Sequence, residues 1–213
     1  SLLEEGWDVV VVDDLSTGVR ENLPEEVRFV EGGAGDRVLV GKLLEEYSID
    51  AVLHFAGSIV VPESVLRPLG YYRNNVCTSR NLIAASVEHG VERFVFSSTA
   101  AVYGEPEQVP VDESAPTGPI SPYGRTKLAV EWMLEDVAAA NPDFDYVALR
   151  YFNVTGADPR GRTGQSTPDA THLIKVASQV AVGDRESLEV FGDNYQTRDG
   201  TCVRDYIHVT DLA

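Results

Sequence analysis

Short apolar, β-branched runs alternate with longer amphipathic stretches along most of this chain. Runs typical of buried strands occupy residues 8–13, 27–30, 51–55, 94–96 and 146–149. Helical patterning occupies residues 37–47, 75–89 and 123–140. Continuous apolar strands separated by helices are typical of a parallel sheet with helices on both faces. The alternation therefore predicts an α/β fold with a doubly wound parallel sheet.

The first strand ends in an acid, Asp13, that only 12 residues precede. In a Rossmann-like, dinucleotide-binding fold, such an acid follows the Gly-rich phosphate loop by about 20 residues. The spacing therefore predicts that the N-terminal strand and its Gly-rich loop are missing from this sequence. The last residues, 209–213, resemble the opening of a helix, so we expect the chain to be incomplete at both ends.

The chain changes character after residue 152. A long loop runs from 156 to 164, and a helix near 172–182 and short strand-like pieces follow it. Loops of this length in compact domains are often functional. We therefore expect a dinucleotide-binding domain over residues 1–152 and the start of a smaller, substrate-binding domain over residues 153–213.

The charge is strongly negative, with 34 acidic against 17 basic residues and a net charge of −17. Such a surface repels phosphate backbones and anionic lipid head groups, which argues against nucleic acid and membrane as partners. Lysine is scarce among the basic residues. High acidity with little lysine is what a protein in concentrated salt would show, because screening removes self-repulsion. A high-salt habitat is a hypothesis that loss of stability on removal of salt would support.

Hydropathy and cysteine content indicate the setting of the chain. No apolar run approaches the roughly 20 residues that a membrane span needs, and no signal peptide is visible at the N-terminus. Cys77 and Cys202 lie far apart and form no CxxC pair. A reduced, cytoplasmic setting is the expectation.

The residues with the clearest chemistry are Tyr123 and Lys127, which four-residue spacing places on one helix face. A phenol with a pKa near ~10 is a poor base, but an adjacent ammonium would lower that pKa. A strand ending in Ser97-Ser98-Thr99 lies upstream and supplies a hydroxyl that can bridge a substrate oxygen to the phenol. The triad of Thr99, Tyr123 and Lys127 predicts removal of an alcohol proton while hydride leaves the carbon. A Tyr–Lys pair alone also occurs on solvated helix faces; the upstream strand favours catalysis.

Several runs resemble the extended short-chain dehydrogenase/reductase superfamily and, within it, the UDP-glucose 4-epimerase (UDP-galactose 4-epimerase) family. The resemblance covers nearly the whole chain. The motifs that carry it are Val11–Gly18, His54–Gly57, Pro62–Val65, Tyr71–Val76, Phe96–Gly104, Ser121–Gly124, Leu149–Asn153 and Asp199–Val209. The last of these is the most characteristic of the family.

The resemblance implies an isomerase that interconverts UDP-glucose and UDP-galactose with bound NAD. Tyr123 would take the 4-hydroxyl proton while hydride passes from sugar C4 to the nicotinamide. The transient 4-keto sugar would then rotate and receive the hydride on its other face. Thr99 would bind the sugar oxygen, and Lys127 would bind the nicotinamide ribose and depress the pKa of Tyr123.

Cofactor choice is indicated by Asp13. A carboxylate at a strand end accepts from ribose hydroxyls and repels a 2′-phosphate, which favours NAD over NADP. The resemblance adds cofactor contacts to those of Thr99, Tyr123 and Lys127, namely Asp14, Leu15, Ser16, Thr17, Gly18, Phe55, Ala56, Gly57, Asn74 and Phe152. No metal site is expected. His54, on an apolar strand, is expected to be a packed residue rather than an acid or base.

For the UDP moiety, the resemblance implies contacts from Asn153, His172, Phe191 and Arg204, in addition to Thr99 and Tyr123. Phe191 would lie against the uracil. Arg204 would bind the diphosphate, for which the planar guanidinium is suited because it donates two bonds at once. The alternative for Arg204 is a salt bridge to a neighbouring aspartate, Asp199 or Asp205.

Two further positions depart from the family pattern. Where the family commonly has Gly-Asp after its third strand, this chain reads Gly32-Gly33-Ala34-Gly35. Either Asp36 substitutes or the adenine contact is lost. Many members carry a lysine where this chain has Ile59. The NAD affinity of the chain is therefore open.

The sequence also bears on alternative activities and on the assembly state. A nucleotide-sugar 4,6-dehydratase needs an acid/base pair where this chain has Ala100-Ala101, and is disfavoured. A 4-epimerase of N-acetylated or glucuronate UDP-sugars and a catalytically idle binding member stay open. Apolar residues recur at helical spacing, which is more typical of core than of interface: Leu82, Ile83, Val87, Leu128, Val130 and Leu134. The resemblance, in which these two helices pair across a two-fold axis, implies a homodimer.

Overall fold

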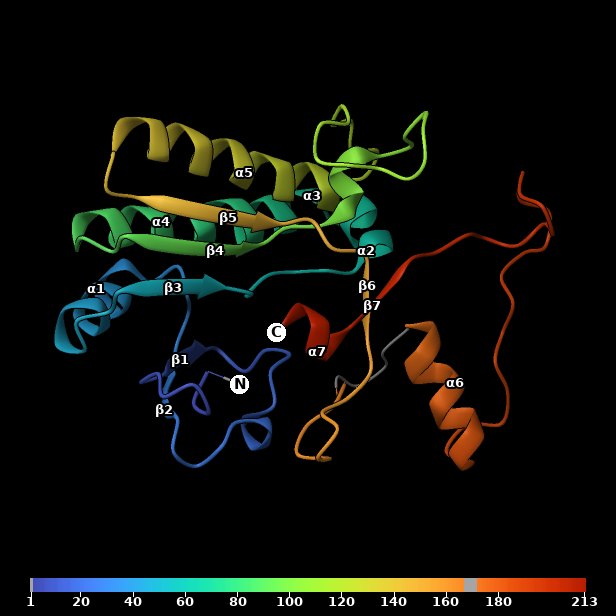
Figure 1. Ribbon diagram of the computed structural model, residues 1–213, viewed down its shortest axis with the longest axis horizontal. Coiled ribbons are helices and arrows are strands. Elements are labelled where there is room, and N and C mark those ends of the chain that lie inside the picture. The colour runs from blue at the N-terminus through green and yellow to red at the C-terminus, as the bar shows by residue number, and fades with distance from the viewer. Residues whose placement is uncertain (1, 167–171) are drawn as a thin grey trace. The chain divides into compact units, whose positions relative to one another are not determined.

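The computed structural model describes residues 2–166 and 172–213 (Figure 1). The chain divides into two compact units. The first, here called the α/β unit, consists of Val11–Asp14 and Phe29–Tyr151. The second, called the loop-rich unit, consists of Ser1–Val10, Leu15–Arg28 and Phe152–Ala213.

A three-stranded parallel sheet forms the centre of the α/β unit. Its strands are β3 (Ala51–His54), β4 (Arg93–Ser97) and β5 (Asp145–Leu149), in the order β3-β4-β5. A separate two-stranded sheet pairs β1 (Val10–Asp13) with β2 (Arg28–Glu31). All five strands coincide with the apolar runs in the sequence, so the parallel α/β fold is confirmed.

Helices cover one face of the three-stranded sheet. They are α1 (Arg37–Glu46), α4 (Thr78–Glu88) and α5 (Pro122–Ala140), and Figure 1 shows α4 and α5 along β4 and β5. Phe94 and Phe96 point into this layer and are each 1% exposed, whereas Leu53 and Val147 on the other face are 44% and 53% exposed. The expectation of helices on both faces is therefore met on one face in the described residues. Successive right-handed crossovers in one direction place their helices on the same side of a sheet.

The core of the α/β unit fills the space between the sheet and these helices. Phe94 and Phe96 pack there with apolar side chains from α1, α4 and α5. The apolar positions at helical spacing are core residues, as the core interpretation expects: Leu82, Ile83, Leu128, Val130 and Leu134 are buried, and Val87 is partly buried.

The starts of α1 and α5 are fixed by side-chain caps. Ser121 Oγ accepts a hydrogen bond of 3.1 Å from Gly124 N, and Pro122 occupies the first turn of α5, where a missing N–H is harmless. Asp36 Oδ1 accepts from Val38 N (3.0 Å) and Leu39 N at the start of α1. The carboxylate that could replace an adenine-binding aspartate therefore caps a helix through one of its oxygens.

The segment between β3 and α4 is more helical than expected. It contains α2 (Val61–Leu66), α3 (Pro68–Tyr71) and a π-helical turn, η2 (Tyr72–Cys77), that runs directly into α4. Prolines in the first turns of α2 and α3 set their starts, which is a favourable proline position. The sequence pattern indicated one helix over 75–89 and did not reveal the π turn, a feature frequent at functional sites.

The loop-rich unit contains few regular elements. A short parallel pair joins β6 (Asn153–Thr155) to β7 (Tyr206–His208). The remaining elements are η1 (Arg20–Asn22), α6 (Leu173–Val182) and α7 (Val209–Leu212). In the long loop, Arg162 pairs with Asp158 and with Glu4. Across the described residues, no helix is both long and apolar enough to cross a membrane.

Candidate active site

Three candidate catalytic residues belong to the α/β unit. Thr99 directly follows β4 and begins the 3₁₀ turn η3 (Ala100–Tyr103), where its Oγ1 accepts from Ala101 N at 3.2 Å. Tyr123 lies in the first turn of α5, and Lys127 follows one turn later. The Thr99 hydroxyl lies near the Tyr123 phenol and acts to lower the phenol's pKa. The structure thus brings the strand-end hydroxyl and the helix phenol together.

The pKa of Tyr123 differs from the sequence-based expectation. Burial of the phenol raises its pKa above the ordinary value of 10.0, and the nearby Tyr151 acts in the same direction. The Thr99 hydroxyl opposes this rise in pKa without cancelling it. Spacing alone suggested a pKa lowered by Lys127. The difference arises because burial, which the sequence does not reveal, disfavours the phenolate.

Lys127 is a buried amine, only 2% exposed. Its Nζ donates a 2.9 Å hydrogen bond to the carbonyl oxygen of Ser97 and lies 5.0 Å from the centre of the Phe96 ring. Burial lowers the pKa of this ammonium to about 8. The pKa of Lys127 is therefore close to neutral pH, and its amine lies beside the end of β4.

Gly57, in the loop after β3, approaches this cluster closely. A Cβ atom at Gly57 would lie 3.1 Å from Asn75 Oδ1 and 3.6 Å from Lys127 Nζ. Only a glycine lets the backbone line the space beside these two groups without displacing one of them. Asp13 ends β1 and Asp14 follows it, and Phe55 and Ala56 follow β3. Ligands of open α/β sheets bind at this carboxyl end of the strands.

Asn75 is a site residue that the sequence reasoning missed. It is 2% exposed and lies in the π turn η2. Its Oδ1 accepts from Ser58 N (2.8 Å), and its Nδ2 donates to Ser58 O and to Thr126 Oγ1 (each 3.0 Å). Thr126 Oγ1 in turn donates to the backbone oxygen of Tyr123. Asn75 therefore ties the loop after β3 to the helix that carries Tyr123.

The neighbouring Asn74 has a different environment. It is exposed, and its Nδ2 donates to Ser58 Oγ at 2.9 Å. The signal that could have revealed Asn75 is the adjacent pair of asparagines inside an otherwise helical stretch, since one member of such a pair faces the core. The sequence reasoning selected only the exposed member as a cofactor contact.

His54 is a packed residue, as expected. It is buried between Phe94 and Phe96, and its Nε2 shares a 2.8 Å hydrogen bond with Ser79 Oγ. Burial, and to a smaller extent the Lys127 charge, lower the pKa of His54 to about 4. The imidazole is therefore neutral at physiological pH and takes no charge in the site.

The candidate substrate residues belong to the loop-rich unit. The pairing of β6 with β7 places Asn153 beside Asp205, whose carbonyl accepts from Asn153 Nδ2 at 2.8 Å. Arg204 is next in sequence, and its Nη1 donates to the carbonyl of Val203. Among the described residues Arg204 forms no ion pair with Asp199 or Asp205. The salt-bridge alternative for Arg204 is therefore wrong in this structure.

The other candidates in the loop-rich unit lie on exposed segments. His172 caps the start of α6, and its Nδ1 shares a 2.7 Å hydrogen bond with Gln165. Phe191 is 87% exposed, and Phe152 is about half exposed. Leu15, which opens the run Leu15–Gly18, has a positive φ of 54°. Among the described residues, no group of acidic, histidine and cysteine side chains could hold a metal ion.

Comparison with known proteins decides the family. All 213 residues match the sequence profile of the NAD dependent epimerase/dehydratase family. The chain belongs to this family. It is 57% identical over 213 residues to a UDP-glucose 4-epimerase of Azospirillum brasilense. The alignment covers 100% of this chain and 61% of that protein.

Solved structures of epimerases are similar to the chain. A UDP-glucose 4-epimerase from Bifidobacterium longum in complex with NAD⁺ and UDP aligns with a TM-score of 0.94 and 40% identity, over 99% of this chain and 66% of that one. A UDP-Glc/GlcNAc 4-epimerase from Campylobacter jejuni aligns with a TM-score of 0.81 and 47% identity, over 99% and 66%. The chain thus spans less than two thirds of the length of these relatives.

The turn η3 contains the positions at which a dehydratase, unlike an epimerase, is expected to carry an acid/base pair. The positions that would carry a dehydratase acid/base pair hold Ala100 and Ala101. Ala100 is buried, and its N–H donates to the carbonyl of Tyr151 at 3.0 Å. A methyl group transfers no proton, so these two positions offer no acid or base, and the Tyr103 hydroxyl at the end of the turn accepts from Arg150.

Proposed function

We propose that the protein is an NAD-dependent nucleotide-sugar 4-epimerase that interconverts UDP-glucose and UDP-galactose through a transient 4-keto sugar. The observation that carries the proposal is the placement of the Thr99 hydroxyl near the Tyr123 phenol, whose pKa it acts to lower, with Lys127 one helical turn away. This arrangement occurs in a chain that is 57% identical to a protein named UDP-glucose 4-epimerase.

The residues present fit NAD at several points. Gly57 lets the backbone after β3 approach Asn75 and Lys127 closely, because a Cβ there would lie 3.1 Å from Asn75 Oδ1. Asp13 ends β1, where a carboxylate accepts from ribose hydroxyls. When bound, NAD would accept the hydride from sugar C4 and return it. The exposed Ile59 supplies no positive charge for the cofactor phosphates.

Tyr123 would act as the base. Its phenolate would accept the proton of the sugar 4-hydroxyl and become the phenol, and Thr99 would donate to the phenolate or the sugar oxygen. Because burial raises the pKa of Tyr123, the phenol needs a nearby positive charge to work at neutral pH. Lys127, whose buried ammonium lies one turn further along α5, is placed to provide that charge and to hold the nicotinamide ribose.

Substrate binding is assigned to the second part of the chain. We assign residues 1–152 to the NAD-binding domain and residues 153–213 to the beginning of the UDP-sugar domain. Arg204, whose guanidinium donates to the carbonyl of Val203, would bind the diphosphate, with Asn153 bonded to the neighbouring Asp205. The exposed ring of Phe191 would lie against the uracil, and His172 would contact the nucleotide.

A second candidate substrate is an N-acetylated UDP-sugar. The supporting observation is the 47% identity to the Campylobacter jejuni enzyme described as acting on UDP-Glc and UDP-GlcNAc. The distinguishing experiment supplies the intact protein with UDP-galactose, UDP-N-acetylgalactosamine or UDP-galacturonate. Faster conversion of UDP-galactose supports the proposal, and preference for the N-acetylated sugar supports the second candidate. A 4-keto-6-deoxy product would contradict both.

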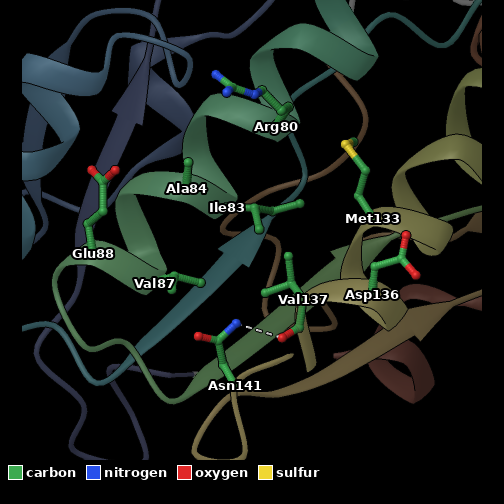
Figure 2. Close-up of a pocket in the computed structure, with 9 residues that line it drawn as sticks. All are labelled: Arg80, Ile83, Ala84, Val87, Glu88, Met133, Asp136, Val137 and Asn141. Atoms are coloured by element: carbon green, nitrogen blue, oxygen red, sulfur yellow. Dashed lines mark hydrogen bonds between the residues drawn. The ribbon is translucent and has the colours of Figure 1, made fainter. Parts of the chain in front are cut away.

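The helices α4 and α5 offer a surface for a homodimer. Between them lies a groove of about 410 Å³ with mainly apolar walls (Figure 2). Its lining residues are Arg80, Ile83, Ala84, Val87, Glu88, Met133, Asp136, Val137 and Asn141. The exposed Trp132 lies on the same helix α5. We propose that a second copy covers this face; Ala84→Arg should then convert a dimer to a folded monomer in sedimentation analysis.

A reducing, cytoplasmic location is consistent with the cysteines. Both Cys77 and Cys202 are free thiols with exposed side chains. Exposed thiols persist where the redox poise keeps cysteines reduced.

A further inference from the structure

A buried ion pair lies next to the candidate catalytic residues and has no role in the chemistry proposed above. Glu131 lies on α5, one turn after Lys127 and two turns after Tyr123, and is buried. Its partner Arg150 follows β5 directly. The pair therefore joins the catalytic helix to the carboxyl end of the central sheet.

The pair is held in one geometry by five hydrogen bonds. Arg150 Nε donates to Glu131 Oε1 (3.2 Å) and Oε2 (3.0 Å), and Arg150 Nη2 donates to Oε2 at 2.6 Å. Ser98 Oγ donates to Glu131 Oε1. On the far side, Arg150 Nη1 donates to the Tyr103 hydroxyl at 3.0 Å, and the guanidinium lies 5.0 Å from the centre of that ring. A planar guanidinium with a bidentate partner has little freedom to rotate.

The two residues that hydrogen-bond to the pair, Ser98 and Tyr103, lie on either side of Thr99 in the sequence. Ser98 is the residue before Thr99, and Tyr103 ends the 3₁₀ turn that Thr99 begins. Between these two anchors, Thr99 Oγ1 accepts from Ala101 N. The position of the Thr99 hydroxyl relative to α5 is thus fixed from both sides by one carboxylate and one guanidinium.

Stability alone does not explain an ion pair at this place. Replacing a buried ion pair with apolar side chains of similar volume is often neutral or stabilising, because desolvation offsets the Coulomb attraction. Apolar side chains would not, however, hold the Ser98 and Tyr103 hydroxyls at fixed points. What the charged pair adds to this otherwise apolar layer is therefore a fixed position for the Ser98 and Tyr103 hydroxyls.

We infer that Glu131, acting with Arg150, is a positioning residue that sets the distance between the Thr99 hydroxyl and the Tyr123 phenol. The inference rests on the proposed 4-epimerase function for its kinetic consequences. Its structural part, the coupling of Glu131 to the placement of the Thr99 hydroxyl near Tyr123, does not depend on the substrate.

The test measures the ionisation of Tyr123 in Glu131→Gln. Glutamine keeps one acceptor oxygen but places an NH₂ group against the guanidinium, so the grip on Ser98 loosens. Because the nearby Thr99 hydroxyl acts to lower the pKa of Tyr123, moving it away should raise that pKa. Removal of a negative charge would by itself lower the pKa of a phenol, so the direction of the shift identifies the cause. Phenolate absorbance, referred to Tyr123→Phe, gives the value.

Kinetics on UDP-galactose provide the second readout. Misplacement of a reacting group by about 1 Å can cost roughly 100-fold in rate, so kcat of Glu131→Gln should fall by about 10- to 100-fold. KM should change little, because Glu131 lies behind the site. The low-pH limb of the kcat profile should move to higher pH. Glu135→Gln, an exposed carboxylate one turn further along α5, is the matched control and should resemble the wild type.

A double variant covers the case in which Glu131→Gln fails to fold. Glu131→Met with Arg150→Met removes both charges together and should fold, yet show the same rise in the Tyr123 pKa. An unchanged pKa and kcat in the folded variants would overturn the inference. A wild-type protein that converts no UDP-sugar would instead contradict the proposed function, while the phenol titration would still decide whether Glu131 positions Thr99.

Discussion

The two units of this chain hold their candidate residues in opposite ways. In the α/β unit, Lys127 and Asn75 are each 2% exposed and bonded to backbone or side-chain partners. In the loop-rich unit, Phe191 is 87% exposed, and among the described residues the Arg204 side chain bonds only to the carbonyl of Val203. The residues proposed for proton transfer are thus held by burial, whereas those proposed for the nucleotide lie on exposed segments.

The difference has an origin in the sequence. Apolar runs of the α/β unit alternate with amphipathic helices and enclose a common core. In the loop-rich unit, the described residues include only Val27 and Val176 as buried apolar side chains. A segment with so little burial depends on hydrogen bonds and ion pairs such as Arg162 with Asp158. The comparison predicts that equivalent substitutions have unequal effects in the two units.

Two phenylalanines should give the largest contrast. Phe96→Ala removes a ring that is 1% exposed and should lower the free energy of unfolding by about 3 to 5 kcal/mol. Phe191→Ala should change it by no more than about 0.5 kcal/mol but should raise KM for UDP-galactose about tenfold, through lost stacking on the base. Chemical denaturation and steady-state kinetics measure both. Equal destabilisation by the two variants would break the comparison.

Acid should destabilise the α/β unit through His54. Its pKa falls from 6.5 in the unfolded chain to about 4 in the folded one, so between these values the unfolded state binds more protons. Stability should therefore be lost as pH falls from about 6.5 to 4, by roughly 3 kcal/mol over that window. His54→Gln should flatten the dependence, and the exposed His89→Gln should retain it. The same slope in all three proteins would show that His54 is not the cause.

Two asparagines offer a smaller contrast. Asn75→Ala removes the partner of the Ser58 N–H and carbonyl and one of the two bonds of the Thr126 hydroxyl, and should cost about 2 kcal/mol. Asn153→Ala removes an exposed bond to the Asp205 carbonyl and should cost about 0.5 kcal/mol or less. Thermal unfolding compares them. A larger loss for Asn153 than for Asn75 would mean that the loop-rich unit carries more of the stability than its burial indicates.

Local sequence patterns predicted the strands and helices of the α/β unit well. The alternation period separates apolar strand runs such as 94–96 from amphipathic helices such as 123–140. Contacts between residues that lie far apart in the sequence could not be predicted from it. Glu131 and Arg150 meet because β5 aligns with β4 in parallel register, and no local pattern encodes that register. The direction of the Tyr123 pKa was missed for a related reason, since burial is a property of the folded chain.

The most direct test of the proposed chemistry is the turnover of UDP-galactose by Tyr123→Phe. The variant keeps the ring and removes only the hydroxyl. Loss of a positioned general base costs roughly 10² to 10⁴ in rate, so kcat should fall by that factor while NAD binding persists. Tyr146→Phe, which removes a hydroxyl from a core-packed ring on β5, is the matched control and should keep its activity. Wild-type turnover in Tyr123→Phe would contradict the account.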